Sequence, residues 1–434
     1  MKQENTIKEL FKFIDQSPTP YHCVESVVKK LDINPIDEAT SWEPKAYKKN
    51  TNNIITRNHS SFVAFKLPNK IDPTKLSFRI IATHTDSPCL KLKIKGHRLN
   101  SSYQQWGTEV YGGSLINTWL DRDLYIAGLI SYIDSKGQHQ IKKIKLDQQL
   151  YRIPQLAIHL DRNVNEKGLL LNKQKHLIPI IGLEESKNLI NHLLDFLPSK
   201  GKGINKDTLF FDLSLCDNTP PAIGGINDEF IYAPRLDNQA MCHASLSAFL
   251  KIQKTEHNTI PLICSFDHEE VGSESLAGAA SNFLGSALGK ICRKFNCEQS
   301  LSEIQARSLM ISADMAHAIH PNYTDRHDPE HLPLIGSGPV IKSNSNMRYA
   351  STPEMNTLFA NLCIKSKVPF QNFVSRSDIG CGSTIGPMAS TKLGIRTIDV
   401  GNPMLSMHSS REMAGVRDHI NIIRVFHRFL KHHD

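Results

Sequence analysis

The sequence contains no apolar run as long as the ~18 residues that a helix needs to cross a bilayer. Its opening residues, MKQENTIKELFKFIDQ, lack the apolar core and small-residue cleavage site of a secretory signal. Nine cysteines are scattered without a CxxC pair, so a dense disulfide framework is not expected. Such thiols are typical of a reducing compartment. We therefore expect a cytoplasmic protein that does not bind membranes.

A concentrated basic motif is also absent. The formal net charge is +8, but the lysines and arginines are spread along the chain without a basic stripe or a basic-aromatic motif. We therefore expect no nucleic-acid partner. The positive charge is consistent with a solvated surface, or with long-range attraction of acidic substrates.

The length of 434 residues, with 40% hydrophobic and 22% charged residues, indicates a globular chain of more than one domain. Residues 1–94 and 224–434 alternate strand-like and helix-like segments. This texture is typical of an α/β fold with a mixed, largely parallel central sheet flanked by helices. Residues 95–223 contain short strand candidates between Gly, Asp and Asn turns, which predicts an inserted β-rich domain.

Periodicity predicts the individual elements. One helix is expected over residues 7–14, ended by Pro18 and Pro20, and a second over residues 24–31. Later helices are expected at about 238–254, 275–292, 353–366 and 410–431, separated by the buried strands PLICSF, SLMISAD, GPVIKS, FQNFVS and GIRTIDVG. The strand candidates of the inserted domain are KLKIKGHRL, TEVYGGSLINTWL, LYIAGLISYI, QIKKIKL and QLAIHL, with one helix near residues 189–197.

Five segments that carry acids or histidines follow predicted strands, and ligands of open α/β sheets bind beyond strand ends. In IIATHTDSP, His84 and Asp86 face the same side of an extended chain. In SFDHEEVG, the adjacent Glu269 and Glu270 face different ways, so one can bind a cation while the other faces a water molecule. Two neighbouring acids after an apolar strand are costly without cations. A solvated acidic loop is the alternative.

Three further residues complete the set. Asp237 precedes a predicted helix, where an aspartate is ordinarily an N-cap. Asp314 follows a buried strand, and His408 precedes the last predicted helix. The nearby His317 and His320 are better interpreted as packing or hydrogen-bonding residues.

This set contains imidazoles and carboxylates but no thiolate. Such ligands suit zinc, manganese or cobalt in a catalytic site. Two ions held side by side polarise a carbonyl and lower the pKa of a shared water. Glu269 is then placed to take the proton of that water and to deliver it to a leaving amine.

Nine blocks spread over nearly the whole chain resemble the aspartyl aminopeptidase family of dinuclear zinc peptidases. They are ATHTDSPCLKLK, VYGGSLINTWLDRDL, RIPQLAIHLDRNVN, FIYAPRLDN, DHEEVGSES, SADMAHAIHPNY, GPVIKSNSNMRYA, CGSTIGP and MHSSREM. The resemblance implies a zinc-exopeptidase-like domain with an inserted dimerisation domain, assembled as a tetrahedral homododecamer. It also implies hydrolysis of the N-terminal peptide bond of peptides that begin with Asp or Glu.

The resemblance assigns roles to individual residues. It implies metal ligation by His84, Asp237, Glu270, Asp314 and His408, with Asp237 bridging two zinc ions for which manganese or cobalt can substitute. Glu269 is implied to be the general base, and Asp86 to orient His84. His159 is implied either to enter a neighbouring subunit's active site or to bind zinc.

The same resemblance implies a cationic pocket for the acidic side chain of the substrate. Lys342 is its candidate cation, with Arg348 and Tyr349 nearby. A lysine that points to solvent is the alternative. Two rival functions follow: a broad-specificity aminopeptidase on the same fold, and a metal-stabilised scaffold without activity. The presence of Glu269 argues against the scaffold.

Overall fold

The computed structural model describes residues 2–39, 47–49, 51–253, 255 and 258–431. The chain forms two compact units. The first comprises Met1–Asp86, Pro221–Met407 and Glu412–Asp434, and the second Ser87–Pro220 and His408–Arg411. These limits differ from the predicted 94/95 and 223/224. The reason is that β5 (Cys89–Asn100) pairs from its first residues with other strands of the second unit.

The first unit is built on a nine-stranded sheet in the order β1-β2-β3-β13-β4-β14-β18-β16-β17. Its strands are β1 (Ile36–Asp37), β2 (Asn52–Arg57), β3 (Ser61–Lys66), β13 (Thr259–Phe266), β4 (Ser77–His84), β14 (Leu309–Ala313), β18 (Arg396–Gly401), β16 (Val340–Lys342) and β17 (Gln371–Phe373). The central strands β13, β4, β14 and β18 are parallel, whereas β3 and β16 run antiparallel to their central neighbours. The predicted mixed, largely parallel sheet is confirmed.

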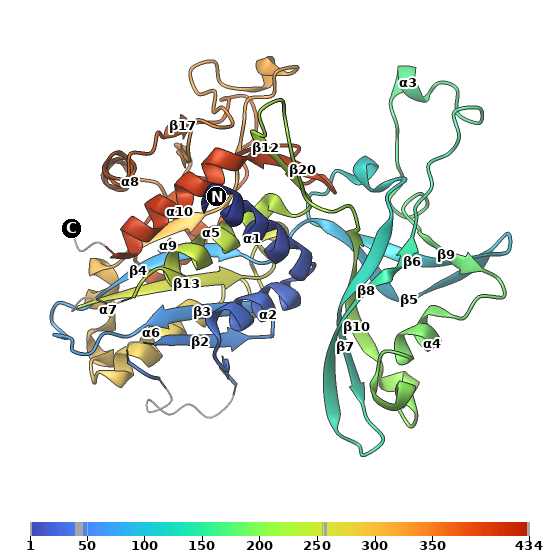
Figure 1. Cartoon of the computed structure of the whole chain (residues 1–434), viewed down its shortest axis with the longest axis horizontal. Helices are drawn as coiled ribbons and strands as arrows, with labels where there is room; N and C mark the ends of the chain where they lie inside the picture. The colour runs from blue at the N-terminus through green and yellow to red at the C-terminus, as the bar shows by residue number, and fades with distance from the viewer. Residues whose placement is uncertain (1, 40–46, 50, 254, 256–257, 432–434) are drawn as a thin grey trace. The chain divides into compact units, whose positions relative to one another are not determined.

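Helices cover both faces of this sheet (Figure 1). One face carries α1 (Lys2–Gln16), α2 (Pro20–Leu31), α5 (Leu236–Leu250), α8 (Pro353–Lys365) and α10 (Val416–Lys431). The other carries α6 (Phe283–Lys294), α7 (Leu301–Arg307) and α9 (Ile385–Leu393). Successive strand residues alternate between the two cores, as Ile80 and Ile81 do. Because both faces are buried, these strands read as continuous apolar runs.

The periodicity predicts that these helices exist, but it misplaces the residues at which some of them begin. Pro20 ends no helix but occupies the first turn of α2, where its missing N–H is tolerated. Helix α6 begins at Phe283 rather than at residue 275. The preceding segment is held in a loop by Arg57, which donates to the carbonyl of Leu276 and to Asn282 Oδ1.

A second sheet of the first unit accounts for another error. It contains β11 (Ala222–Gly224), β12 (Phe230–Ala233), β20 (Glu412–Gly415), β19 (Pro403–Leu405) and β15 (Ala316–His317). The helix predicted from residue 410 begins only at Val416, because residues 412–415 form β20 and pair with β12. No local pattern reveals a partner about 180 residues away.

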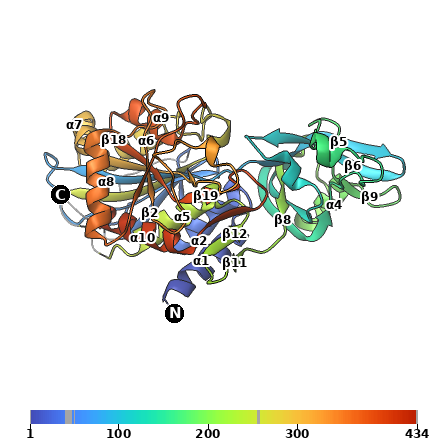
Figure 2. The same cartoon turned by 90° about the horizontal axis from the view of Figure 1, so that it is seen from above.

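The second unit is built on a six-stranded antiparallel sheet in the order β8-β7-β10-β5-β6-β9. Figure 1 labels all six strands, and Figure 2 shows β5, β6, β8 and β9 from a second direction. Its remaining strands are β8 (His139–Tyr151), β7 (Leu124–Ile133), β10 (Phe210–Asp217), β6 (Tyr103–Tyr111) and β9 (Ile180–Leu183). The sheet and α4 (Leu189–Leu194) share a core that includes Trp106 and Leu213. The β-rich texture of this part is therefore confirmed.

One strand predicted in the second unit is absent. The segment QLAIHL, residues 155–160, is irregular and ends in a turn. Its apolar residues Leu156, Ile158 and Leu160 are exposed, so no apolar face is buried against a sheet.

None of the helices in the described part of the chain is long and apolar enough to span a membrane.

Candidate functional site

The proposed ligands of the first unit gather at the carboxyl-terminal edge of its central strands. His84 is the last residue of β4, and Asp314 directly follows β14. Glu269 and Glu270 form a short 3-10 turn shortly after β13, and Asp237 is the second residue of α5. Because these central strands are parallel, their ends share one edge. Four segments far apart in the chain are thereby brought together.

His84 lies at the centre of this cluster. Its Nε2 is 3.2 Å from Asp314 Oδ1 and 3.4 Å from Asp237 Oδ1, and its Nδ1 is 3.3 Å from Asp86 Oδ1. The imidazole and these carboxylates are buried. Burial alone lowers the pKa of His84, but its contacts with Asp237, Asp314 and Asp86 raise it well above its ordinary value.

The two adjacent glutamates share a support. The main-chain N–H of Glu269 donates to Asp86 Oδ1 at 3.2 Å, and that of Glu270 donates to Asp86 Oδ2 at 3.1 Å. The pKa of Glu269 is raised to about 8, chiefly by burial; His84 acts to lower it and the nearby Asp314 acts to raise it. Burial and Asp237 raise the pKa of Glu270 well above its ordinary value.

The side chains of this cluster fit divalent cations. His84, Asp237 and Asp314 each offer one ligand atom within 4.8 Å of the others, and so do His84, Glu269 and Glu270. Asp237 and Glu270 also come within that distance of each other. So many carboxylates around one imidazole are costly to bury unless cations balance them. Imidazole and carboxylate ligands without a thiolate are those of catalytic zinc.

Three polar residues that sequence reasoning missed hold Asp237 in place. The amide of Asn238 donates to the Ala313 carbonyl at 2.9 Å, and that of Gln239 donates to the Thr85 carbonyl at 2.8 Å. The main-chain N–H of Asp237 donates to Glu412 Oε2 at 3.0 Å. The start of α5 is thus tied to the ends of β14 and β4. The one available signal was a run of polar residues at the start of an apolar helix.

The proposed substrate residues divide into two groups. Lys342 is buried, with Nζ 3.6 Å from Asp314 Oδ2 and 5.5 Å from the centre of the Tyr349 ring. Lys342 therefore does not point to solvent. Arg348 is exposed, and its Nε donates to the carbonyl of Cys381 at 3.3 Å.

Two proposed site residues belong to the second unit. His408 Nδ1 lies 3.2 Å from the carbonyl oxygen of Gly113, and the His408 carbonyl accepts from the Leu115 N–H. His159 is exposed in the turn that ends the segment QLAIHL. The assignments of both histidines to the active site stay predictions.

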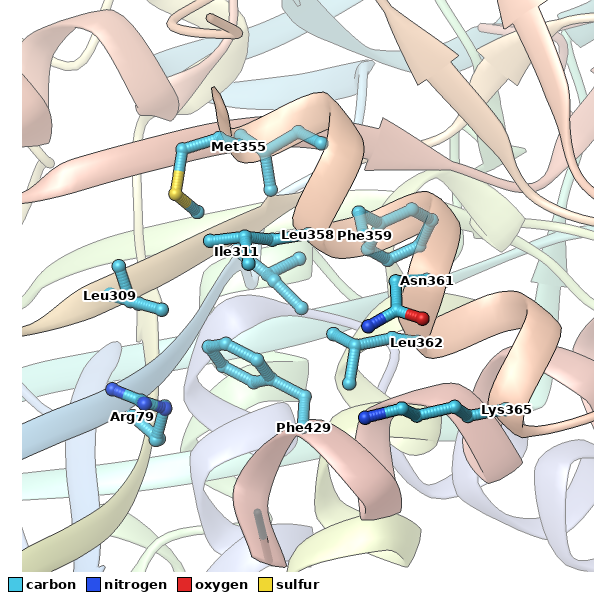
Figure 3. Close-up of a pocket in the computed structure, with 11 residues that line it drawn as sticks. Arg79, Leu309, Ile311, Met355, Leu358, Phe359, Asn361, Leu362, Lys365 and Phe429 are labelled. Carbon is cyan, nitrogen blue, oxygen red and sulfur yellow. The ribbon is translucent and has the colours of Figure 1, made fainter. Parts of the chain in front are cut away.

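An apolar cavity of about 80 Å³ lies elsewhere in the first unit (Figure 3). Its lining includes Leu309 and Phe429, with Arg79 and Lys365 among the polar members. Leu309 begins β14, whereas Asp314 follows the end of that strand, so the cavity lies away from the acidic cluster. None of the described residues that line it carries a carboxylate or an imidazole.

Comparison with known proteins decides the family. The model of the aminopeptidase I zinc metalloprotease family (M18) matches residues 13–430. The chain belongs to the M18 family. An M18 protein is a zinc-dependent aminopeptidase, and the carboxylate and imidazole cluster is where this chain can hold zinc.

M18 relatives resemble the chain over nearly its whole length. An aspartyl aminopeptidase of Dictyostelium discoideum is 38% identical over 472 residues, covering 98% of this chain and 96% of the relative. A solved complex of Ape4 and Nbr1 superposes with a TM-score of 0.92 at 36% identity, covering 99% of this chain and 86% of that one. The S. cerevisiae mApe1 dodecamer gives a TM-score of 0.80 at 26% identity, covering 99% and 97%.

Proposed function

We propose that this M18 aminopeptidase removes acidic residues from peptide N-termini. The observation that carries the proposal is the burial of the Lys342 ammonium beside the acidic cluster, 3.6 Å from Asp314 and over the Tyr349 ring. A charge-assisted contact with a substrate carboxylate contributes about 1.5–3 kcal/mol, whereas an apolar substrate side chain makes no such contact with the ammonium. The name of the Dictyostelium relative supports the same preference.

We propose His84, Asp237, Glu270, Asp314 and His408 as ligands of two zinc ions, replaceable by manganese or cobalt. Bound zinc supplies a Lewis acid that polarises the scissile carbonyl and acidifies a water. Glu269 acts as the general base that moves the proton of that water to the leaving amine. Asp86 orients both the ligand His84, which it contacts, and the turn that carries Glu269 and Glu270, whose main-chain N–H groups it accepts.

We further propose a homo-oligomer, a tetrahedral dodecamer, in the cytoplasm. The solved mApe1 dodecamer supports the assembly. The β-rich segment 95–223 would carry the dimer contacts, and His159 would act in a neighbouring subunit. The exposed Leu156 and Leu160 beside His159 support a contact there. None of the nine cysteines, all within the described residues, forms a disulfide, which supports a reducing compartment.

The decisive experiment compares aspartyl, glutamyl and leucyl reporter peptides. Lys342→Met keeps an unbranched apolar side chain, one atom shorter than lysine, and removes the charge. We expect kcat/KM for the aspartyl reporter to fall roughly 10- to 100-fold relative to the leucyl reporter. Lys66→Met is the matched control, because Lys66 is also buried, its ammonium also lies over an aromatic ring, that of Phe249, and it belongs to no proposed site; the aspartyl-to-leucyl ratio should be unchanged in it. An unchanged aspartyl-to-leucyl ratio in Lys342→Met would instead support a broad-specificity enzyme.

A further inference from the structure

Asp399, a buried residue of β18 to which sequence analysis assigned no role, joins two loop segments. It is 0% exposed. Its Oδ2 accepts from the main-chain N–H of Ala350 at 2.6 Å, and its Oδ1 accepts from Thr384 Oγ1 at 2.6 Å. Its own main-chain N–H donates to Ser351 Oγ at 3.1 Å. One residue therefore holds both the segment that follows Tyr349 and the start of α9.

The surroundings of Asp399 supply a donor to each of its side-chain oxygens. Thr384 occupies the N-cap position of α9, yet its hydroxyl donates to Asp399 and makes no cap bond. A Cβ added at Gly386 would lie only 2.4–2.5 Å from the two carboxylate oxygens, so α9 packs directly on them. Burial raises the pKa of Asp399, while the bonds from Thr384 and Ala350 lower it.

Asp399 is also linked to Lys342. In the antiparallel pair of β16 and β18, Val340 lies opposite Gly401 and Ile341 opposite Val400. Continuation of this register places Lys342 opposite Asp399. The charge of Lys342 acts on Asp399 and lowers its pKa. The ammonium of Lys342 in turn lies over the ring of Tyr349, the neighbour of Ala350.

We propose that Asp399 is a positioning residue that holds Tyr349 and Lys342 in the arrangement that binds an acidic substrate side chain. It thereby sets the preference for acidic over neutral N-terminal residues without touching the substrate. The inference rests on the proposed function of Lys342. An anchored Ala350 fixes the main chain of Tyr349, and a fixed Tyr349 ring restricts the flexible lysine. Preorganisation of this kind lowers the entropic cost of binding.

The test is Asp399→Asn, which keeps the shape but removes the charge and one acceptor. We expect KM for the aspartyl reporter to rise about tenfold, with KM for the leucyl reporter and the zinc content nearly unchanged. Asp418→Asn is the matched control, because Asp418 is also fully buried and accepts two main-chain N–H groups, from Gly336 and Gly338. Asp418→Asn should lower the stability of the fold about as much as Asp399→Asn does. It should leave the ratio of kcat/KM for the aspartyl reporter to that for the leucyl reporter unchanged. Equal changes of that ratio in both variants overturn the inference, as does an unchanged ratio in Asp399→Asn.

Milder variants decide the case if Asp399→Asn does not fold. Thr384→Val and Ser351→Ala each remove one partner of Asp399, and each should lower the aspartyl-to-leucyl ratio about threefold. A ratio unchanged in both overturns the inference.

Lys342→Met, measured alongside, separates this inference from the proposed function. If Lys342→Met leaves the ratio unchanged, the proposal that Lys342 binds an acidic side chain is refuted, and so is the proposed role of Asp399. If Lys342→Met lowers the ratio while Asp399→Asn does not, only the role of Asp399 fails. Addition of Asp399→Asn to Lys342→Met should cause no further loss of the ratio, because a residue that acts through Lys342 has no effect in its absence. A further tenfold loss in the double variant overturns the inference.

Discussion

Asp86 Oδ1 accepts the main-chain N–H of Glu269 at 3.2 Å and lies 3.3 Å from Nδ1 of His84. One carboxylate thus contacts both a proposed ligand and the proposed base. Its second oxygen accepts from Glu270 N, so the whole turn that carries the two glutamates is held by a single side chain. Through Asp86, the orientation of the proposed ligand His84 therefore depends on the position of the proposed base Glu269.

Asp86→Asn is expected to reduce kcat about 10- to 100-fold, the range typical of residues that orient metal ligands. The amide places an NH₂ group where one main-chain N–H now finds an acceptor, so the turn shifts. Steady-state kinetics and metal analysis test this. Zinc content should fall less than kcat. A variant with full kcat would show that Asp86 does not orient the turn.

Glu269→Gln and Glu270→Gln should separate base from ligand. Glu269→Gln is expected to retain zinc and the fold but to lose roughly 10²- to 10⁴-fold in kcat, as loss of a general base does. Glu270→Gln is expected to bind zinc more weakly than Glu269→Gln does, and to lose kcat because the metal is lost. Metal content and kcat measured on both variants provide the comparison. Equal zinc loss in the two would refute the division of roles.

Removal of zinc by a chelator should destabilise the first unit, because its buried acidic side chains then lack the cations that balance them. Readdition of zinc at about 100 times its dissociation constant should restore about 2.7 kcal/mol of stability. Thermal unfolding with and without zinc measures the effect, and metal analysis should find two ions per chain. Glu270→Gln serves as a control whose response to zinc should be much weaker.

The buried pair His243 and His419 predicts a pH dependence of stability. Nδ1 of His243 lies 2.9 Å from Nε2 of His419, so one neutral ring donates to the other. Burial lowers the pKa of His419 to about 3, and burial together with His419 lowers the pKa of His243 well below its ordinary value. At these two positions the unfolded chain therefore binds more protons below about pH 6.5, and their contribution to stability falls as pH drops from there toward 3.

Chemical unfolding between pH 4 and 6 tests this sign. Each buried histidine should contribute a slope of about 1.4 kcal/mol per pH unit. His419→Gln should reduce the slope by about 1.4 kcal/mol per pH unit, the contribution of one proton. His59→Asn changes an exposed histidine at a left-handed turn position and should leave the slope unchanged. A slope that is the same in His419→Gln as in the unsubstituted chain would contradict the prediction.

The sequence by itself determined the α/β class, because strands buried on both faces must read as apolar runs such as PLICSF and SLMISAD. It also indicated the acidic cluster. Parallel strands end at one edge, so His84, Asp314 and the Glu269–Glu270 pair could be expected to meet once each was found after a strand. These inferences needed only local pattern and one rule of sheet geometry.

Tertiary structure decided what depends on distant partners. Residues 412–415 are a strand rather than helix because they pair with residues 230–233. Glu412 reaches Asp237 across 175 residues, and Asp399 reaches Ala350 across 49. A buried carboxylate is stable only where donors converge on it. Which donors converge is set by the packing of the whole chain, and local sequence carries no record of it.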